Sequence, residues 1–194
     1  MGSIKTVLIL AVGALMMLGS CENDPYAEMK SRELQSGVRF DSVFLGLEFG
    51  MSKKEFFDRC WALNRQKIVR EGPANSSVQY PLKDELGAAG VLQFYPNFHR
   101  DKAYEVQASF YYDGWAPWNR HLFADSLQPK VRDLLADWYD IEFTEIKGTK
   151  LGDVFVTMDG NRRIVIGVRD EQIVDVSITD MTVADQLLKD PFIK

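Results

Sequence analysis

Six short stretches of the chain are either apolar or alternate between hydrophobic and polar residues, patterns typical of β-strands. In the clearest of them, Val106, Ala108 and Phe110 alternate with Gln107 and Ser109. Such alternation indicates an antiparallel sheet with one face toward solvent. The six predicted strands cover residues 78–82, 91–95, 104–112, 154–158, 164–168 and 174–178.

A first helix is predicted to begin after Ser52, because Ser52 and Glu55 have the spacing of a capping box. Met51 and Phe56 stand at the positions of a hydrophobic staple, which supports the same start. Gly72-Pro73 predicts the end of this helix, since neither residue favours its continuation.

A second helix is predicted over residues 123–138, where Leu127, Val131 and Leu134 have helical spacing. Pro129 lies inside this stretch and lacks a backbone donor, so we expect a kink or a restart near Ser126. The tail over residues 181–194 is predicted to contain at most a short helix at 183–188.

The order of these elements, a helix followed by three strands and then the same again, predicts an α+β fold. Helices would cover one face of an antiparallel sheet, and the pattern leaves open whether the two halves form one continuous sheet. Residues 38–194 are predicted to form a single domain. Residues 21–37 are mostly polar and are predicted to be a tether with at most a short helical stretch.

An uncharged, apolar run over residues 6–20 follows Lys5 near the N-terminus. It is shorter than the roughly 20 residues that a membrane-spanning helix needs, and it predicts a signal peptide over residues 1–20. Its end, Leu18-Gly19-Ser20-Cys21, resembles the lipobox of bacterial lipoproteins. This resemblance implies cleavage before Cys21 and lipidation of Cys21, and hence a firm membrane anchor. The alternative is an ordinary secretory signal.

Two acidic residues, Glu22 and Asp24, follow the predicted lipidation site. They resemble the acidic export signal of surface lipoproteins in Bacteroidetes-type bacteria, although Asn23 interrupts them. The whole chain is similar to uncharacterised lipoproteins of these bacteria. The resemblance implies an outer-membrane location, in the periplasmic leaflet or at the surface, and the alternative for Glu22 and Asp24 is an ordinary polar tether.

Charge and cysteine content narrow the classes of partner. The chain has 23 basic and 28 acidic residues, a net charge of −5, and removal of Lys5 with residues 1–20 makes it −6. This balance argues against nucleic acid and against an anionic lipid surface. Cys21 and Cys60 are the two cysteines, so lipidation of Cys21 leaves no pair for an intramolecular disulfide.

The start of the first helix also carries a family resemblance. Gly50, Met51, Ser52, Glu55 and Phe56 are similar to a helix start in SmpA/BamE-type envelope lipoproteins. The wider group that shares this helix-and-sheet unit includes β-lactamase-inhibitor-like folds. The resemblance implies a structural accessory role in outer-membrane assembly. It covers one helix start, and the chain departs from the family's usual short stop over residues 60–64.

Cys60, His99 and His121 raise the question of a cysteine hydrolase, because a thiol nucleophile needs a nearby base. Cys60 lies between Phe56 and Leu63 on an apolar helix face, which favours a buried structural thiol. Neither histidine has a second His or Cys at ligand spacing. We therefore predict no catalytic residue, no metal site and no cofactor.

Aromatic residues are densest where the third strand joins the second helix, at Tyr112, Trp115 and Trp118. Tyr95 and Phe98 would join them if a hairpin over residues 91–112 brought its loops close. Exposed rings of this kind suit a glycan or a peptide. The alternative is that Trp115 and Trp118 fill the junction between sheet and helix.

Together these features predict a lipid-anchored, non-enzymatic envelope protein. Its partner would be a protein or a glycan, bound through the sheet face or the aromatic residues. A structural accessory of outer-membrane assembly and a hydrolase that uses Cys60 are the alternatives.

Overall fold

The computed structural model describes residues 24–73 and 76–187. The predicted signal peptide, Cys21, Glu22 and the end of the tail lie outside the described residues. The helices are α2 (Pro25–Ser36), α3 (Lys53–Arg65), α4 (Ala124–Tyr139) and α5 (Met181–Ala184), with 3-10 turns η2 (Arg120–Leu122) and η3 (Asp185–Leu187). The strands are β1 (Arg70–Glu71), β2 (Val78–Leu82), β3 (Gly90–His99), β4 (Lys102–Tyr112), β5 (Thr144–Thr149), β6 (Gly152–Asp159), β7 (Arg162–Val168) and β8 (Val174–Asp180).

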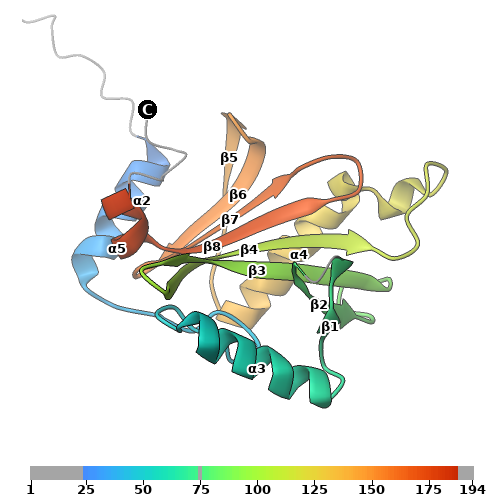
Figure 1. Ribbon diagram of the computed structural model, residues 1–194. Helices are drawn as coiled ribbons and strands as arrows, with labels where there is room; N and C mark the ends of the chain where they lie inside the picture. Colours follow the sequence, from blue (N-terminus) through green and yellow to red (C-terminus); the bar gives the residue numbers. More distant parts are fainter. Residues whose placement is uncertain (1–23, 74–75, 188–194) are drawn as a thin grey trace, which may run out of the picture.

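The strands form one antiparallel sheet in the order β1-β2-β3-β4-β8-β7-β6-β5 (Figure 1). Its centre is the pairing of β4 with β8, where Val106 lies opposite Ile178. Each half of the chain therefore contributes four strands that run from an edge to the centre. This arrangement answers the open question, because the two halves share a continuous sheet.

The six predicted strands are confirmed, and two further strands form the edges of the sheet. Arg70 and Glu71 of β1 are both exposed, and β5 carries exposed residues such as Glu145 and Lys147. Neither segment contains a buried residue, whereas each inner strand does. Charged, short edge strands of this kind discourage pairing with other chains.

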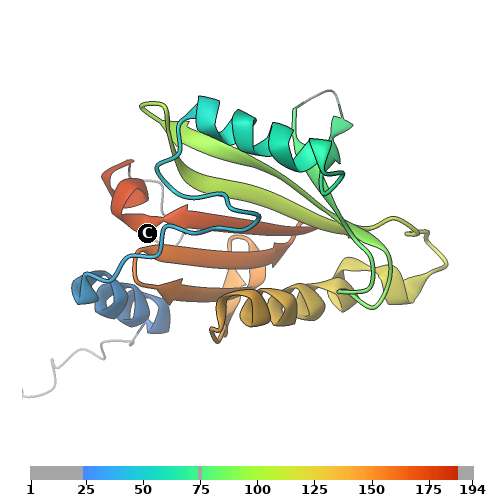
Figure 2. The ribbon, with the colours of Figure 1, turned by 90° about the horizontal axis from the view of Figure 1, so that it is seen from below.

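α3 and α4 cover one face of the sheet, as predicted. Phe56 of α3 and Leu127 of α4 belong to a single core with Phe94, Val106 and Ile178 of the strands. Figure 2 shows the two helices on the same side, with the segment that precedes α3 crossing between them. In that segment Val43, Leu47 and Phe49 are buried, so it completes the cover of this face.

α2 packs against the opposite face of the sheet, over β6 and β7. Tyr26 is 3% exposed and lies in a cluster with Val154, Val156 and Val165. The prediction that residues 21–37 form a tether is therefore wrong for α2. A polar helix can be held by one buried aromatic side chain, and the low hydrophobicity of the segment conceals that contact.

Asp24 is the N-cap of α2. Its carboxylate accepts hydrogen bonds from the backbone N–H groups of Tyr26, at 3.0 Å, and Ala27, at 3.4 Å. Gly37 ends the helix with φ +68°, a conformation that glycine adopts without strain. Capping explains Asp24 without a sorting role, and that role stays a prediction.

α3 begins as predicted but ends at Arg65, so the predicted end at Gly72-Pro73 is wrong. The Asn64 side chain donates to the carbonyl oxygen of Val69 at 3.2 Å, and Lys67 adopts φ +60°. These contacts turn the chain back toward the sheet, bury Val69 and allow β1 to form. Contacts made after the helix, rather than the Gly-Pro pair, decide its length.

The second predicted helix is α4, which begins at Ala124 and continues beyond Pro129 to Tyr139. The proline lies in its second turn, where few backbone hydrogen bonds depend on it. The short helix predicted in the tail corresponds to α5 and η3. No helix of the described residues is both long and apolar enough to span a bilayer.

Candidate functional site

The predicted aromatic residues do not form one cluster. Tyr112 is buried, donates its hydroxyl to the carbonyl of Leu86 at 3.1 Å and accepts a hydrogen bond from Lys130 at 3.0 Å. Trp115 packs on Phe123 with ring centroids 5.5 Å apart. Tyr112 and Trp115 therefore belong to the packing between sheet and helix, which was the alternative prediction for Trp115.

Trp118 is 81% exposed and does not fill that junction. Tyr95 and Phe98 lie toward the other end of the β3–β4 hairpin, because Phe98 pairs with Ala103 beside the turn whereas Tyr112 pairs with Gly90. The expectation that they would join Tyr112 is wrong, since the two groups are separated along the strands.

A first candidate site is the part of the sheet that no helix covers, which we call the open face. It combines polar side chains from four neighbouring strands with a hollow of about 750 Å³. Lys150 and Leu151, in the turn between β5 and β6, border this hollow. The side chains of the open face are those of Gln79, Gln93, Gln107, Ser109, Tyr111, Asp175 and Ser177.

Hydrogen bonds join the amides at one side of the open face. Gln79 Nε2 donates to the Tyr111 hydroxyl at 2.8 Å and to Gln93 Oε1 at 3.1 Å. Arg70 Nε donates to Gln79 Oε1 at 2.9 Å. Burial and the nearby Asp113 carboxylate raise the pKa of Tyr111, so its hydroxyl keeps its proton at neutral pH.

A charged group lies at the opposite side of the open face. Arg169 Nε donates to Asp175 Oδ2 at 2.7 Å, and Arg169 Nη2 donates to Ser109 Oγ at 3.0 Å. Ser109 donates in turn to Asp175 Oδ1 at 2.8 Å. The Arg169 and Asp175 side chains are 50% and 41% exposed, so both remain accessible to a ligand.

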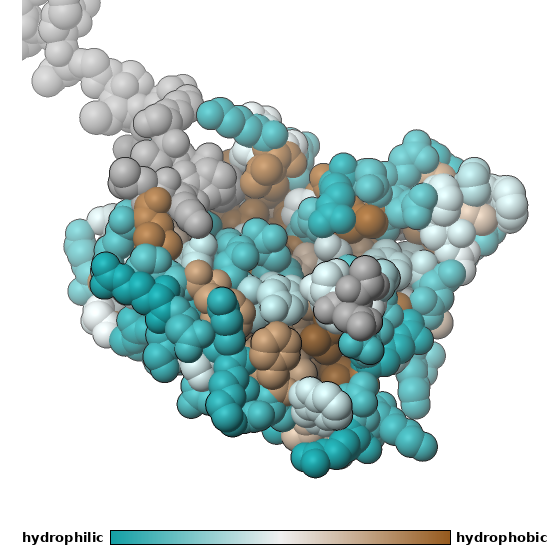
Figure 3. Space-filling view, in the orientation of Figure 1, coloured by the Kyte–Doolittle hydropathy of each residue, from teal (hydrophilic) through white to brown (hydrophobic). Residues whose placement is uncertain are grey.

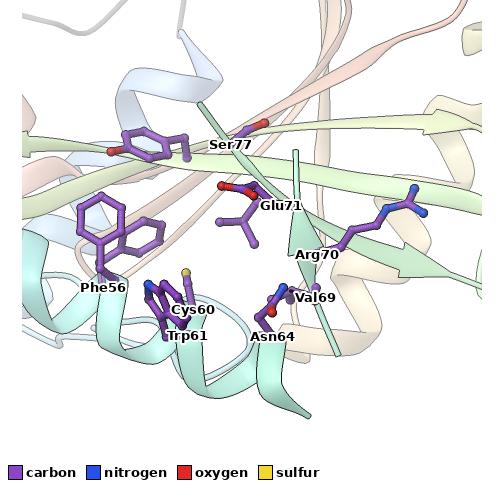
Figure 4. Close-up of a pocket in the computed structure, with 11 residues that line it drawn as sticks. Phe56, Cys60, Trp61, Asn64, Val69, Arg70, Glu71 and Ser77 are labelled. Carbon is purple, nitrogen blue, oxygen red and sulfur yellow. Dashed lines mark hydrogen bonds between the residues drawn. The ribbon is translucent and has the colours of Figure 1, made fainter. Parts of the chain in front are cut away.

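A second candidate site is a groove between α3 and the β1–β2 edge, which we call the α3 groove. Its volume is about 190 Å³. Figure 3 shows hydrophobic side chains gathered in a hollow between these elements, and Figure 4 shows the residues around it. The groove is lined by Phe56, Phe57, Cys60, Trp61, Asn64, Val69, Arg70, Glu71, Ser77, Val78 and Tyr95.

Cys60 lies in this groove as the buried thiol that the sequence predicted. Burial raises the pKa of Cys60 to about 11, against a smaller lowering by Arg59. The thiolate is therefore scarce at neutral pH, and the described residues that line the groove include no histidine. This environment disfavours a nucleophilic role.

Within residues 24–73 and 76–187, no group of three or more His, Cys, Asp or Glu side chains is placed to hold a metal ion. Comparison with protein-family models, with curated proteins and with solved structures finds no match to this chain. The similarity of its first helix start to SmpA/BamE-type lipoproteins stays a prediction.

The alternating pattern predicts only that the residues of the open face lie on the solvent-facing side of a sheet. It does not show which part of that side stays uncovered. The sequence pattern did not predict the α3 groove, because β1 was not predicted and the helix was expected to continue through the residues that form β1.

Proposed function

We propose that this chain is a lipid-anchored protein of a bacterial outer membrane that binds a glycan on the open face and catalyses no reaction. The observation that carries this proposal is the contrast between the two faces of the sheet. α3 and α4 cover one face, whereas the other holds hydrogen-bonded polar side chains around a hollow of about 750 Å³.

The chemistry of the open face favours a glycan over a protein. Protein interfaces typically have an apolar and aromatic centre, whereas Gln93, Gln107 and Ser177 present amides and a hydroxyl. These groups both donate and accept hydrogen bonds, as sugar hydroxyls do. The bonds among Arg169, Asp175 and Ser109 hold the site in place before a ligand arrives, which lowers the entropy lost on binding.

An aromatic ring lies at the rim of the same face. Tyr95 is 38% exposed and borders the hollow together with Gln107. A flat ring beside hydrogen-bonding groups offers a sugar an apolar surface at little entropic cost. Tyr95 is the one predicted ligand-binding residue that lies on the open face.

The lipobox-like sequence at Cys21 supports the membrane anchor. Pro25, the first residue of α2, is four positions after Cys21 in the chain. Such a stretch spans at most roughly 14 Å. A lipidated Cys21 would thus hold the domain close to the headgroups.

Mass spectrometry of the protein purified from membranes tests the anchor. We expect an N-terminal peptide that begins at Cys21 and carries acyl chains. An unmodified N-terminus at any residue would overturn the lipoprotein part of the proposal.

An array of bacterial and host polysaccharides tests the ligand. The full chain, held in phosphatidylglycerol nanodiscs, should bind a defined subset of glycans. Gln107→Ala and Asp175→Ala should weaken that binding, and Trp118→Ala, at an exposed position elsewhere, should not. Absence of binding, or equal binding by all three variants, would overturn the glycan assignment.

A further inference from the structure

We infer that the α3 groove binds an alkylammonium group, the side chain of a lysine on a partner protein. The groove combines three features that such a group needs: aromatic ring faces, an apolar floor and a carboxylate. The groove shares Ser77 and Tyr95 with the edge of the open face, but its carboxylate and its rings on α3 lie outside that face, so the inference does not depend on glycan binding.

The aromatic wall is built from α3 and β3. Phe56 packs edge to face with Phe57 and with Tyr95, at centroid distances of 5.5 and 5.6 Å. Trp61, on the next turn of α3, is 69% exposed and Phe57 is 46% exposed. Large rings left open to solvent beside a groove favour a ligand, and a cation gains energy from the negative faces of such rings.

The carboxylate comes from the opposite wall. In Figure 4 the Glu71 side chain points toward the aromatic side of the groove, and the Arg70 side chain points away from it. Arg70 donates a hydrogen bond to Gln79 at 2.9 Å, so its guanidinium group lies at the open face. Of the neighbouring residues Arg70 and Glu71, only Glu71 therefore directs its charge into the groove.

The groove offers an ammonium group one carboxylate acceptor. Ser77 Oγ is buried against Gly72 and adds none. An ammonium group has three donors and no acceptor. Glu71 can accept from it, and the remaining donors can stay in water at the groove mouth.

Two basic side chains of α3 are engaged away from this groove. Lys54 forms an ion pair with Asp58 at 2.6 Å, on the exposed side of the helix. Arg59 donates to the carbonyl oxygen of Leu45 at 2.7 Å. Neither side chain lines the groove, so neither neutralises Glu71, whose carboxylate points into it.

The size of the groove limits its occupant to one side chain. Its volume of about 190 Å³ is close to the roughly 150 Å³ of an apolar cavity that holds benzene. Lysine has a four-carbon stem that ends in a compact charge. The stem would lie on Cys60 and Val78, with the ammonium group beside Glu71 and the rings.

The position of the groove favours a protein over a lipid headgroup. In Figures 1 and 2 the first turn of α2 and the helix α3 lie at opposite sides of the molecule. If Cys21 carries the anchor, as proposed above, the groove faces away from that membrane. The preference for a protein lysine over a lipid headgroup rests on the proposed anchor. The preference for an alkylammonium group does not.

Fluorine NMR of the full chain labelled with 5-fluorotryptophan tests the site. The chain has four tryptophans, and Trp61→Phe identifies the signal of Trp61. Nanodiscs of phosphatidylglycerol are used because this lipid has no amine. Titration with Nα-acetyl-lysine amide should shift the Trp61 signal saturably, and the neutral Nε-acetylated probe should bind at least about fivefold more weakly.

Matched variants make the outcome decisive. Glu71→Gln should weaken the lysine probe by about fivefold, and Glu142→Gln, an exposed glutamate elsewhere, should leave it unchanged. No shift of Trp61, or equal binding of the two probes, would overturn the inference. Tighter binding of phosphoethanolamine than of the lysine probe would overturn the protein source. Glycan binding by Glu71→Gln is measured in parallel, so failure of this site and failure of the open face are distinguished.

Discussion

Replacing Tyr26 with alanine tests whether α2 belongs to the folded domain. Tyr26 is 3% exposed and packs against Val154, Val156 and Val165. Truncation of a buried aromatic side chain costs about 3–5 kcal/mol, because it leaves a cavity. A residue in a solvated tether would instead change stability by no more than about 0.5 kcal/mol. The two descriptions of this segment thus differ by a measurable amount.

The variant Tyr26→Phe separates the hydroxyl from the ring. Arg163 Nη1 donates to the Tyr26 hydroxyl at 3.0 Å, and both groups are buried. Hydrogen bonds to charged groups contribute about 1.5–3 kcal/mol. We expect Tyr26→Phe to lose an amount in this range and Tyr26→Ala to lose more.

Urea unfolding followed by circular dichroism provides the measurement. With a slope of about 2 kcal/mol per molar urea, a loss of 3–5 kcal/mol lowers the midpoint by roughly 1.5–2.5 M. Trp118→Ala is the control, because Trp118 is 81% exposed and its loss should leave the midpoint unchanged. Equal midpoints for Tyr26→Ala and Trp118→Ala would refute the packing of α2.

Three further changes have defined outcomes. Burial raises the pKa of Cys60 to about 11, so the unfolded thiol ionises first and stability should fall as the pH rises from about 9 to 11. The urea midpoint of Cys60→Ala should fall less over this range, because only the buried tyrosines then contribute, and parallel curves for the two proteins would contradict this. Asp24→Ala should lose about 1 kcal/mol of unfolding free energy with the α2 cap, and an unchanged midpoint would count against the cap. Gly160→Ala should lower the free energy of unfolding more than Gly148→Ala does, by about 1–3 kcal/mol, because a Cβ at Gly160 would clash with the Val38 carbonyl oxygen and one at Gly148 has nothing within 4 Å. Equal losses at the two glycines would contradict that contact.

Much of the local structure could be predicted because its causes lie within a few residues of one another. The capping box is complete: Glu55 N–H donates to Ser52 Oγ at 3.2 Å, and Ser52 N–H donates to Glu55 Oε2 at 2.7 Å. Val106 and Ile178 are buried as the alternation requires. Cys60 is buried because its helix face was already apolar.

The edge strands and α2 could not be predicted for the opposite reason. Arg70 and Glu71 enter the sheet because β2 is there to pair with them, at Gln79 and Val78. Tyr26 is buried because β6 and β7, more than a hundred residues away, offer it an apolar surface. No window of neighbouring residues contains either cause.

The candidate sites show the same division. Gln107 and Ser109 could be placed on the wet face of a strand, yet the hollow they border requires β8 beside β4. Tyr112 looked like a ligand-binding residue until its burial and its bond to Leu86 were seen. Trp61 and Glu71 meet across a groove only because the chain turns back after α3.

By itself the sequence determined the start of α3, the inner strands and the α+β class, because capping and alternation act between near neighbours. The tertiary structure alone decided the strand order, the packing of α2 and the course of the chain from α3 into β1. These depend on burial between distant segments, where a single side chain such as Tyr26 outweighs the polar character of its surroundings. Both candidate sites are products of that second kind of contact.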